Sequence, residues 1–358
     1  MTSWRYCWGR AAGGLALLLL GALLILACGS PAKSAPLSSN LANPSGLNPA
    51  AGASRTLKVV TTVSPITNIV ENIGGARIRL EGVVPEGVNS HTFTPAPSVA
   101  RLIAEADLIV LNGLFLEQPT LDLARANKRP EAVILSLGER AISRGEWKFD
   151  FSFPASEGHP NPHLWPDPLL ALRYAELVNG QLTLLDPANA GYYDANLEQF
   201  RRRVLTLDQG IRAAVATIPP GNRKLLTYHD SWAYFAGRYG MEVIGAAQPS
   251  DFSQPSVREV AGLIDQVKAL KLPAIFGSEV FPSDVLATIA REAGAAFVNR
   301  LRDDDLPGAP GGPRHSYLGL MVENMEIMIP ALGGAASPLF GFNTGPVFEG
   351  LSGTVYPQ

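Results

Sequence analysis

Cysteine is almost absent from this chain. Its 358 residues include only Cys7 and Cys28, and Cys7 lies in an N-terminal segment that we expect to be cleaved off. A mature chain with one cysteine has no internal disulfide and no cysteine-ligated metal site, so a metal site would need histidine and carboxylate ligands. An excess of one charge is also lacking, because the formal net charge is -3. This gives no reason to expect nucleic acid as a partner.

Long apolar runs are scarce, and the longest lies at the N-terminus. It spans residues 11–27, follows Arg5 and Arg10, and ends at Cys28. This order of charge, apolar core and small residues is typical of a secretory signal peptide, although about 17 residues is also the short limit for a retained membrane helix. Ile25-Leu26-Ala27-Cys28 resembles a bacterial lipobox, which implies that Cys28 is lipidated. We therefore expect an exported protein that is lipid-anchored to the outer face of a bacterial membrane, or periplasmic.

Composition and periodicity divide the rest of the chain into a tether, two α/β lobes and a connecting helix. Ser, Pro, Ala, Asn and Gly dominate residues 29–55, which predicts a flexible tether. Beyond it, β-branched apolar segments alternate with helical segments twice, which predicts a mainly parallel sheet flanked by helices in each lobe. The predicted parts are a signal peptide (1–27), the lipidated Cys28 with its tether (28–55), an N-terminal lobe (56–185), a linking helix (186–217), a C-terminal lobe (218–334) and an unassigned tail (335–358).

The linking helix is predicted from its start signal and its spacing. Asp186-Pro187 places a capping side chain before a proline in the first turn. Apolar residues then recur at helical spacing up to about Thr217 without a proline. About 30 residues would span about 45 Å. We expect a rigid connector that limits hinge rotation between the lobes.

The five histidines supply the candidate site. His91 and His229 each follow a predicted strand, one in each lobe, and ligands of open parallel sheets bind beyond the carboxyl ends of strands. His163 lies in Asn161-Pro162-His163-Leu164-Trp165. Three neutral imidazoles leave one position on a tetrahedral ion, and the acidic run Asp303-Asp304-Asp305 lies at the same sheet end. His159 is expected to be solvated, and His315 to lie near a helix cap.

At these residues the chain resembles the zinc- and manganese-binding solute-binding lipoproteins of ABC importers, the cluster A-I family. The resemblance runs from about Lys58 to Leu332. The segments that carry it, in order, are Val60–Gly75, Val84–Phe93, Asn161–Trp165, Asp186–Asn196, His229-Asp230 and Ser316–Asn324. The order of these segments together is far more specific than any one of them.

The resemblance implies a metal held between two α/β lobes by His91, His163, His229 and one aspartate. Aligned on Leu306, that aspartate is Asp304, with an uncertainty of one residue within the acidic run. Histidine at position 229 is similar to the zinc-binding members, so we expect Zn²⁺, with Mn²⁺ as the alternative. The implied partners are the permease of an ABC importer and the membrane that holds the lipid anchor, and we expect a monomer.

Two other functions stay open on the sequence alone. A zinc hydrolase would use three histidines and an open position on the ion, but His-Glu-x-x-His and Gly-x-Ser-x-Gly motifs are absent. We therefore expect no enzyme activity. A surface adhesin stabilised by metal is the second alternative. Because imidazole binds metal only when neutral, we expect affinity to fall below about pH 6.5.

Overall fold

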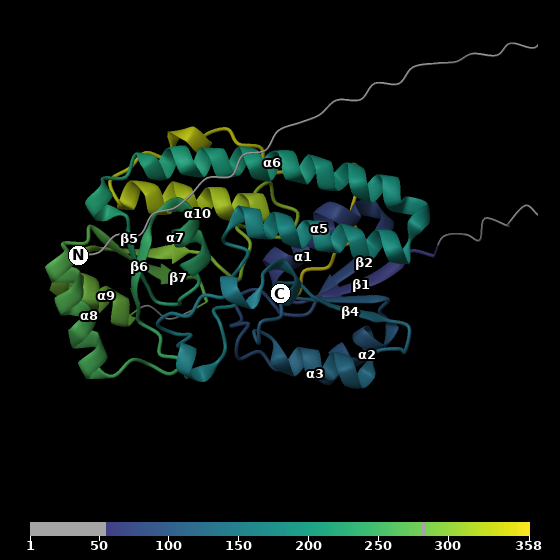
Figure 1. Ribbon diagram of the computed structural model, residues 1–358, viewed down its shortest axis with the longest axis horizontal. Helices are drawn as coiled ribbons and strands as arrows, with labels where there is room; N and C mark the ends of the chain where they lie inside the picture. The colour runs from purple at the N-terminus through teal and green to yellow at the C-terminus, as the bar shows by residue number, and fades with distance from the viewer. Residues whose placement is uncertain (1–54, 281–283) are drawn as a thin grey trace, which may run out of the picture. The chain divides into compact units, whose positions relative to one another are not determined.

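The computed structural model describes residues 55–280 and 284–358. The predicted signal peptide, the lipidation site at Cys28 and the tether up to residue 54 lie outside the described residues. In the described ranges no helix combines the length and the apolar character needed to cross a membrane. Two four-stranded sheets with flanking helices confirm the predicted fold class (Figure 1).

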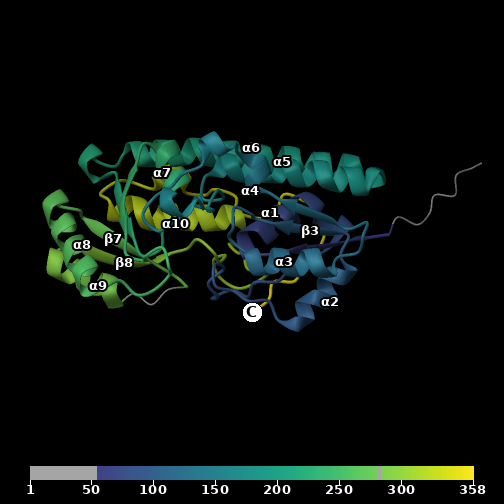
Figure 2. The ribbon, with the colours of Figure 1, turned by 60° about the horizontal axis from the view of Figure 1, so that its bottom comes forward.

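The first sheet is wholly parallel and has the strand order β2-β1-β3-β4. Its strands are β1 (Leu57–Thr61), β2 (Ile78–Gly82), β3 (Leu108–Leu111) and β4 (Val133–Ser136). The flanking helices are α1 (Ser64–Gly74), α2 (Pro97–Glu105), α3 (Gln118–Asn127) and the short α4 (Gly138–Ala141). Helix α1 lies on one face, and α2 and α3 lie on the other (Figures 1 and 2). This double cover explains why the central strand β3 is apolar and buried throughout.

The second sheet repeats this arrangement in the order β6-β5-β7-β8, again with all pairs parallel. Its strands are β5 (Lys224–Thr227), β6 (Glu242–Ala246), β7 (Ala274–Ser278) and β8 (Ala296–Leu301). Its helices are α7 (Ala233–Tyr239), α8 (Val257–Leu270), α9 (Asp284–Ala293) and α10 (Tyr317–Ala331). Both sheets therefore have the same topology, although their sequences show no repeat.

Helix α6 (Ala190–Ala216) connects the two lobes. Its 27 residues span about 40 Å, and it contacts α1 and α5 of the first lobe and α7 and α10 of the second (Figure 1). The sequence predicted one helix from Asp186, whereas Asp186 ends a separate helix, α5 (Pro168–Leu185). The Asp186 carboxylate accepts hydrogen bonds from Asn189 and Tyr193, so its side chain stabilises the corner between α5 and α6.

The interface between the lobes is packed and hydrogen-bonded. Trp165 and Tyr317 are fully buried within a core that continues from the first lobe through α6 and α10 into the second. The Trp165 indole donates to the carbonyl of Asp303 at 2.7 Å, and the Tyr317 hydroxyl donates to the carbonyl of Trp165 at 2.8 Å. A separate small cluster lies beneath α8 and α9. Because the two lobes share one close-packed core, we expect any hinge movement between them to be small.

Candidate metal centre

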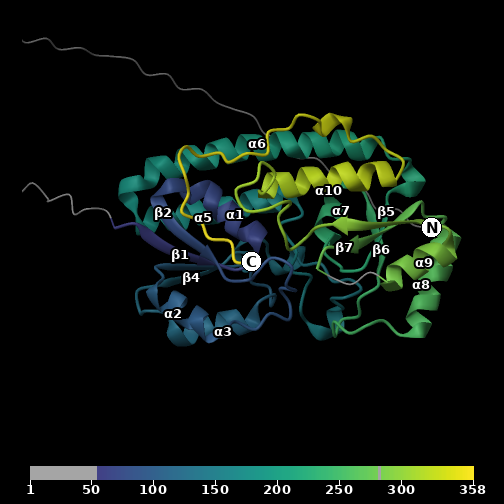
Figure 3. The same cartoon turned by 180° about the vertical axis from the view of Figure 1, so that it is seen from behind.

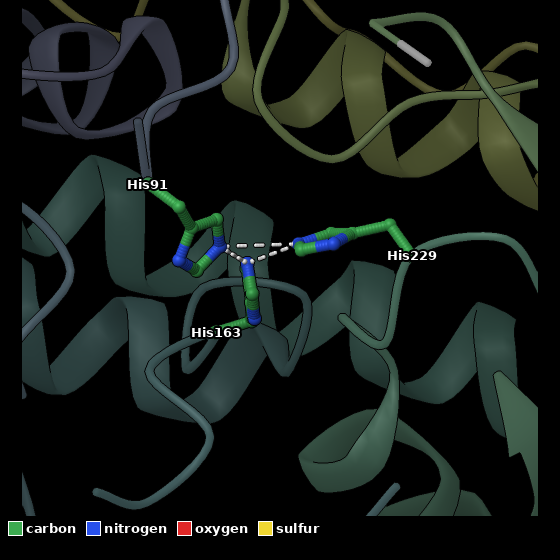
Figure 4. A group of neighbouring side chains, drawn as sticks. All are labelled: His91, His163 and His229. Atoms are coloured by element: carbon green, nitrogen blue, oxygen red, sulfur yellow. Dashed lines mark hydrogen bonds between the residues drawn. The ribbon is translucent and has the colours of Figure 1, made fainter. Parts of the chain in front are cut away.

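Three imidazoles meet where the two lobes face each other (Figure 4). Nε2 of His91 lies 3.1 Å from Nε2 of His163 and 3.2 Å from Nε2 of His229, and the latter two atoms are 2.9 Å apart. A tetrahedral zinc ion with Zn–N distances of about 2.0–2.1 Å separates its ligand nitrogens by about 3.3 Å. The triangle is therefore close to the size that one ion requires.

Each histidine comes from a different segment of the chain. His91 lies in the loop between β2 and α2, His163 lies in the irregular segment before α5, and His229 follows β5 directly. The strand-end rule thus identifies His91 and His229 correctly as neighbours, although 138 residues separate them. His163 lies in a turn in which its backbone amide donates to Oδ1 of Asn161 at 3.0 Å, and this turn places its ring beside the other two.

Two amide side chains orient the rings. Nδ1 of His163 lies 2.8 Å from Oδ1 of Asn161, and Nδ1 of His229 lies 2.6 Å from Oε1 of Gln248. With the proton held on Nδ1, each of these rings presents its Nε2 lone pair to the centre of the cluster. Neither partner was predicted from the sequence. Asn161 lies two residues before His163 and was recognisable in the motif, whereas Gln248 lies 19 residues after His229 without a local signal.

Burial keeps these imidazoles neutral. Desolvation, together with the neighbouring His229, holds the pKa of His91 well below its usual value. The pKa of His163 is lowered for the same reasons. Burial also lowers the pKa of His229 to about 4, although Gln248 works in the opposite direction. The sequence-based expectation of proton competition near pH 6.5 used the pKa of a solvated imidazole, and burial moves protonation of these rings to lower pH.

The acidic run lies beside the histidines, and its members differ in what they face. Oδ2 of Asp303 lies 3.8 Å from Nε2 of His229. Asp304 instead accepts a hydrogen bond from the Ser90 amide at 3.2 Å. Asp305 accepts from the Gly87 amide with both oxygens, at 3.0 and 2.8 Å. Among the three, Asp303 places a carboxylate oxygen next to the His229 ring nitrogen, while Asp304 and Asp305 hold the loop that carries His91.

Glu279, which the sequence argument did not single out, organises this acidic run. Its Oε1 accepts from the backbone amides of Asp303, Asp304 and Asp305 at 3.0, 3.1 and 3.0 Å. Burial, reinforced by Asp303, raises the pKa of Glu279 to about 8. Burial likewise raises the pKa of Asp303. Glu279 follows β7 directly, so the strand-end rule that found His229 would also have found it.

Among the described residues, these carboxyl groups have no lysine or arginine counterpart. In residues 55–280 and 284–358, neither Glu279 nor any member of the acidic run forms an ion pair with lysine or arginine. The buried Oδ2 of Asp303 and Oδ1 of Asp304 also lack a hydrogen-bond donor within the described residues. Buried carboxylates are stable only when paired or coordinated. A divalent cation held by the three imidazoles would supply the missing positive charge.

A cavity of about 150 Å³ leads to His91. Its wall includes Phe115 and His159 from the first lobe and Phe252 from the second. The His91 ring stacks on Phe252 with ring centroids 4.7 Å apart, while His163 and His229 are buried behind it. His159 is exposed, stacks on Phe115 at 4.1 Å, and does not join the cluster of three. His315 lies directly before Ser316, the N-cap of α10, as predicted, and its side chain is buried.

The fold and the site together define a class of protein. Two similar α/β lobes, a stiff connecting helix and a buried site of three histidines beside unpaired carboxylates are the features of a metal-binding solute-binding protein.

Comparison with known proteins places the chain more closely. The profile of the family described as "Zinc-uptake complex component A periplasmic" matches residues 59–331, and the chain belongs to this family. It is a solute-binding protein of the ABC metal importers, the cluster A-I type predicted from the sequence, and not an enzyme.

Individual relatives cover most of the chain. The "Manganese-binding lipoprotein MntA" of Halalkalibacterium halodurans is 27% identical over 276 residues, which are 77% of this chain and 88% of that protein. The "Zinc-binding protein TroA" of Treponema pallidum is 27% identical over 284 residues, or 76% and 88% of the two chains. The solved structure of the periplasmic zinc-binding protein TroA from Treponema pallidum superposes with a TM-score of 0.71 at 25% identity, covering 78% of this chain and 99% of that one.

Proposed function

We propose that this chain captures a single divalent transition-metal ion, zinc in preference to manganese, and presents it to the permease of an ABC importer. The observation that carries the proposal is the convergence of three Nε2 atoms within 3.2 Å of one another. The printed names of the relatives include both zinc and manganese proteins, so they do not decide between the metals. Ligand type supports zinc, because imidazole nitrogen suits zinc better than manganese, which favours oxygen ligands.

We propose Asp303 as the fourth ligand, in place of Asp304, which the sequence alignment favoured. The 3.8 Å between Asp303 Oδ2 and His229 Nε2 supports this choice, since two ligands of one tetrahedral ion lie about 3.3 Å apart. Asp304 is directed to the Ser90 amide instead. The aspartate would fill the position that a hydrolase needs for water. Neither the site nor the family supports the hydrolase alternative.

The ion is proposed to reach the site through the cavity at His91. A volume of about 150 Å³ is well above the roughly 10–15 Å³ that one water molecule needs, so a partly hydrated ion fits. His91 is the ring that this cavity reaches, and His163 and His229 lie behind it. Loss of water and binding to His91 would therefore come first. Lipidation at Cys28, anchoring outside the cytoplasm and a monomeric state belong to the same proposal.

Calorimetric titration of the metal-free protein with zinc tests the proposal. Wild type should bind one zinc ion per chain, and manganese should compete weakly. His229→Ala removes one ligand and should weaken zinc binding by at least about 100-fold, because the apparent energy of a four-ligand zinc site is about 10–16 kcal/mol. His159→Ala is the matched control and should bind as wild type does. Unchanged zinc binding by His229→Ala would reject the site.

A further inference from the structure

The C-terminal segment after α10 lies beyond the part of the chain that matches the family, which ends at residue 331. No structure was predicted for residues 335–358, yet they pack on both lobes. Figure 3 shows this segment leaving α10, running along α6 and descending to the first sheet. Leu339 in its first turn is buried against α6 at Gly210. Farther on, the Val347 amide donates to Asn72 of α1 at 3.1 Å.

The last residues of the segment pair with the edge of the first sheet. The Val355 amide donates to the carbonyl of Leu80 at 2.9 Å, and the Gly82 amide donates to the carbonyl of Val355 at 3.0 Å. Val355 thus forms a parallel bridge to Glu81 in β2, which is the edge strand of that sheet. These bonds satisfy edge groups that would otherwise face water. Strand β2 leads directly into the loop that carries His91.

The same segment holds that loop itself. The Glu86 amide donates to the carbonyl of Pro357 at 3.2 Å. At the start of the loop, the Val83 and Val84 amides donate to the carbonyls of Thr61 and Thr62, at the end of β1. Farther on, Gly87 donates to Asp305 and Ser90 to Asp304 of the second lobe. Beyond Val84, the loop is therefore supported by contact between the lobes and by the C-terminal segment.

Tyr356 fixes the segment at a partly buried junction. Its hydroxyl donates to Glu71 at 2.6 Å and accepts from Asn68 at 3.0 Å. Asn68 also accepts from the Tyr317 amide at the start of α10 at 2.8 Å, so this junction joins α1, α10 and the C-terminus. The Tyr356 ring meets His315 edge-on, with centroids 4.8 Å apart.

We infer that residues 355–358 form a positioning strap that keeps the His91 loop in its metal-binding conformation when the lobes separate. The inference rests on the proposed function of the site. When the lobes part, the bonds to Asp304 and Asp305 are lost, while those to Val355 and Pro357 stay within the first lobe. A loop that is already ordered binds without a further ordering penalty, which raises affinity. Loss of the strap should weaken zinc binding about tenfold, or about 1.4 kcal/mol.

Two changes test the strap. A chain that ends at Thr354 removes all of its contacts with β2 and Glu86. Val355→Pro in the full chain removes the amide that donates to Leu80, and Val355→Ala keeps that amide and is the matched control. Zinc affinity is measured by competition with a chromophoric chelator. Amide hydrogen exchange of residues 83–91 in the metal-free protein reports loop order without any metal.

The truncated chain and Val355→Pro should bind zinc about tenfold more weakly and exchange the loop amides faster, with exchange in β3 unchanged. Val355→Ala should match wild type in both measurements. Wild-type zinc affinity together with wild-type loop exchange in the truncated chain would overturn the strap. If the truncated chain does not fold, the same two measurements on Val355→Pro decide the question. A wild-type protein that binds neither zinc nor manganese would instead defeat the proposed function.

Discussion

The pH dependence of zinc affinity follows from the burial of the histidines, and it can be worked out numerically. With solvated imidazoles of pKa near 6.5, proton competition at pH 5 would lower zinc affinity about 30-fold per ring, or about 3 × 10⁴-fold for three rings. Burial lowers the pKa of His229 to about 4. At that value, competition at pH 5 reduces affinity by only about a tenth. The pKa values of His91 and His163 are also lowered, so these rings should compete little with protons.

Burial shifts the pKa values of the carboxyl groups upward, opposite to those of the imidazoles, so the carboxyl groups should set the pH dependence of zinc affinity. Because burial raises the pKa of Glu279 to about 8 and raises that of Asp303, the metal-free cluster holds a proton at neutral pH. Zinc should displace about one proton. The logarithm of zinc affinity should thus rise with pH between about pH 5 and 7 with a slope near one. Calorimetry in buffers of different ionisation enthalpy measures both the slope and the proton release. A slope near three with a midpoint near pH 6.5 would refute the burial argument.

Four further results are expected. Gln248→Leu removes the acceptor that orients His229, and zinc affinity measured by chelator competition should fall about 10- to 100-fold; an unchanged value would show that the ring needs no such partner. In the same assay Asp303→Asn should weaken zinc binding more than Asp304→Asn, and the reverse order would restore Asp304 as the ligand. Removal of zinc by a chelator should lower the unfolding temperature but leave the far-UV circular dichroism native, whereas unfolding would favour a metal-stabilised structural protein. Glu279→Gln keeps an acceptor for three amides but cannot ionise. Because the pKa of Glu279 is raised in the folded chain, the wild-type fold loses stability as pH rises from 4.5 to about 8. The unfolding temperature of the variant, relative to wild type, should therefore increase over that range, and a constant difference between the two would contradict the raised pKa.

Sheet strands and strand-end residues were predictable because their signals are local. The segments Leu108–Leu111 and Ala274–Ser278 are short apolar runs bounded by turns, and both are strands as predicted. The carboxyl ends of parallel strands share one edge, so His91 and His229 could be placed near one another without knowing the contacts. Helix periodicity likewise revealed most of α6.

Features set by distant contacts could not be predicted. Three consecutive aspartates differ only in the direction of their side chains, and that direction depends on amides held by Glu279. The orienting role of Gln248 depends on the path of a loop after β6. The C-terminal segment has no apolar periodicity from which its structure could be predicted. Its end is held by backbone hydrogen bonds at Val355 and Pro357, which any residue type can form. The long helix was predicted too far toward the N-terminus because Asp186-Pro187 starts a 3₁₀ turn before α6.

The central claim is that one ion binds where His91, His163 and His229 converge. Anomalous diffraction at the zinc absorption edge, from crystals of the zinc-loaded protein, tests it most directly. The account predicts one strong peak per chain within about 2.0–2.1 Å of all three Nε2 atoms, with a carboxylate oxygen of the acidic run completing a tetrahedron. A zinc peak elsewhere on the chain, or one in contact with fewer than three of these imidazoles, would contradict it.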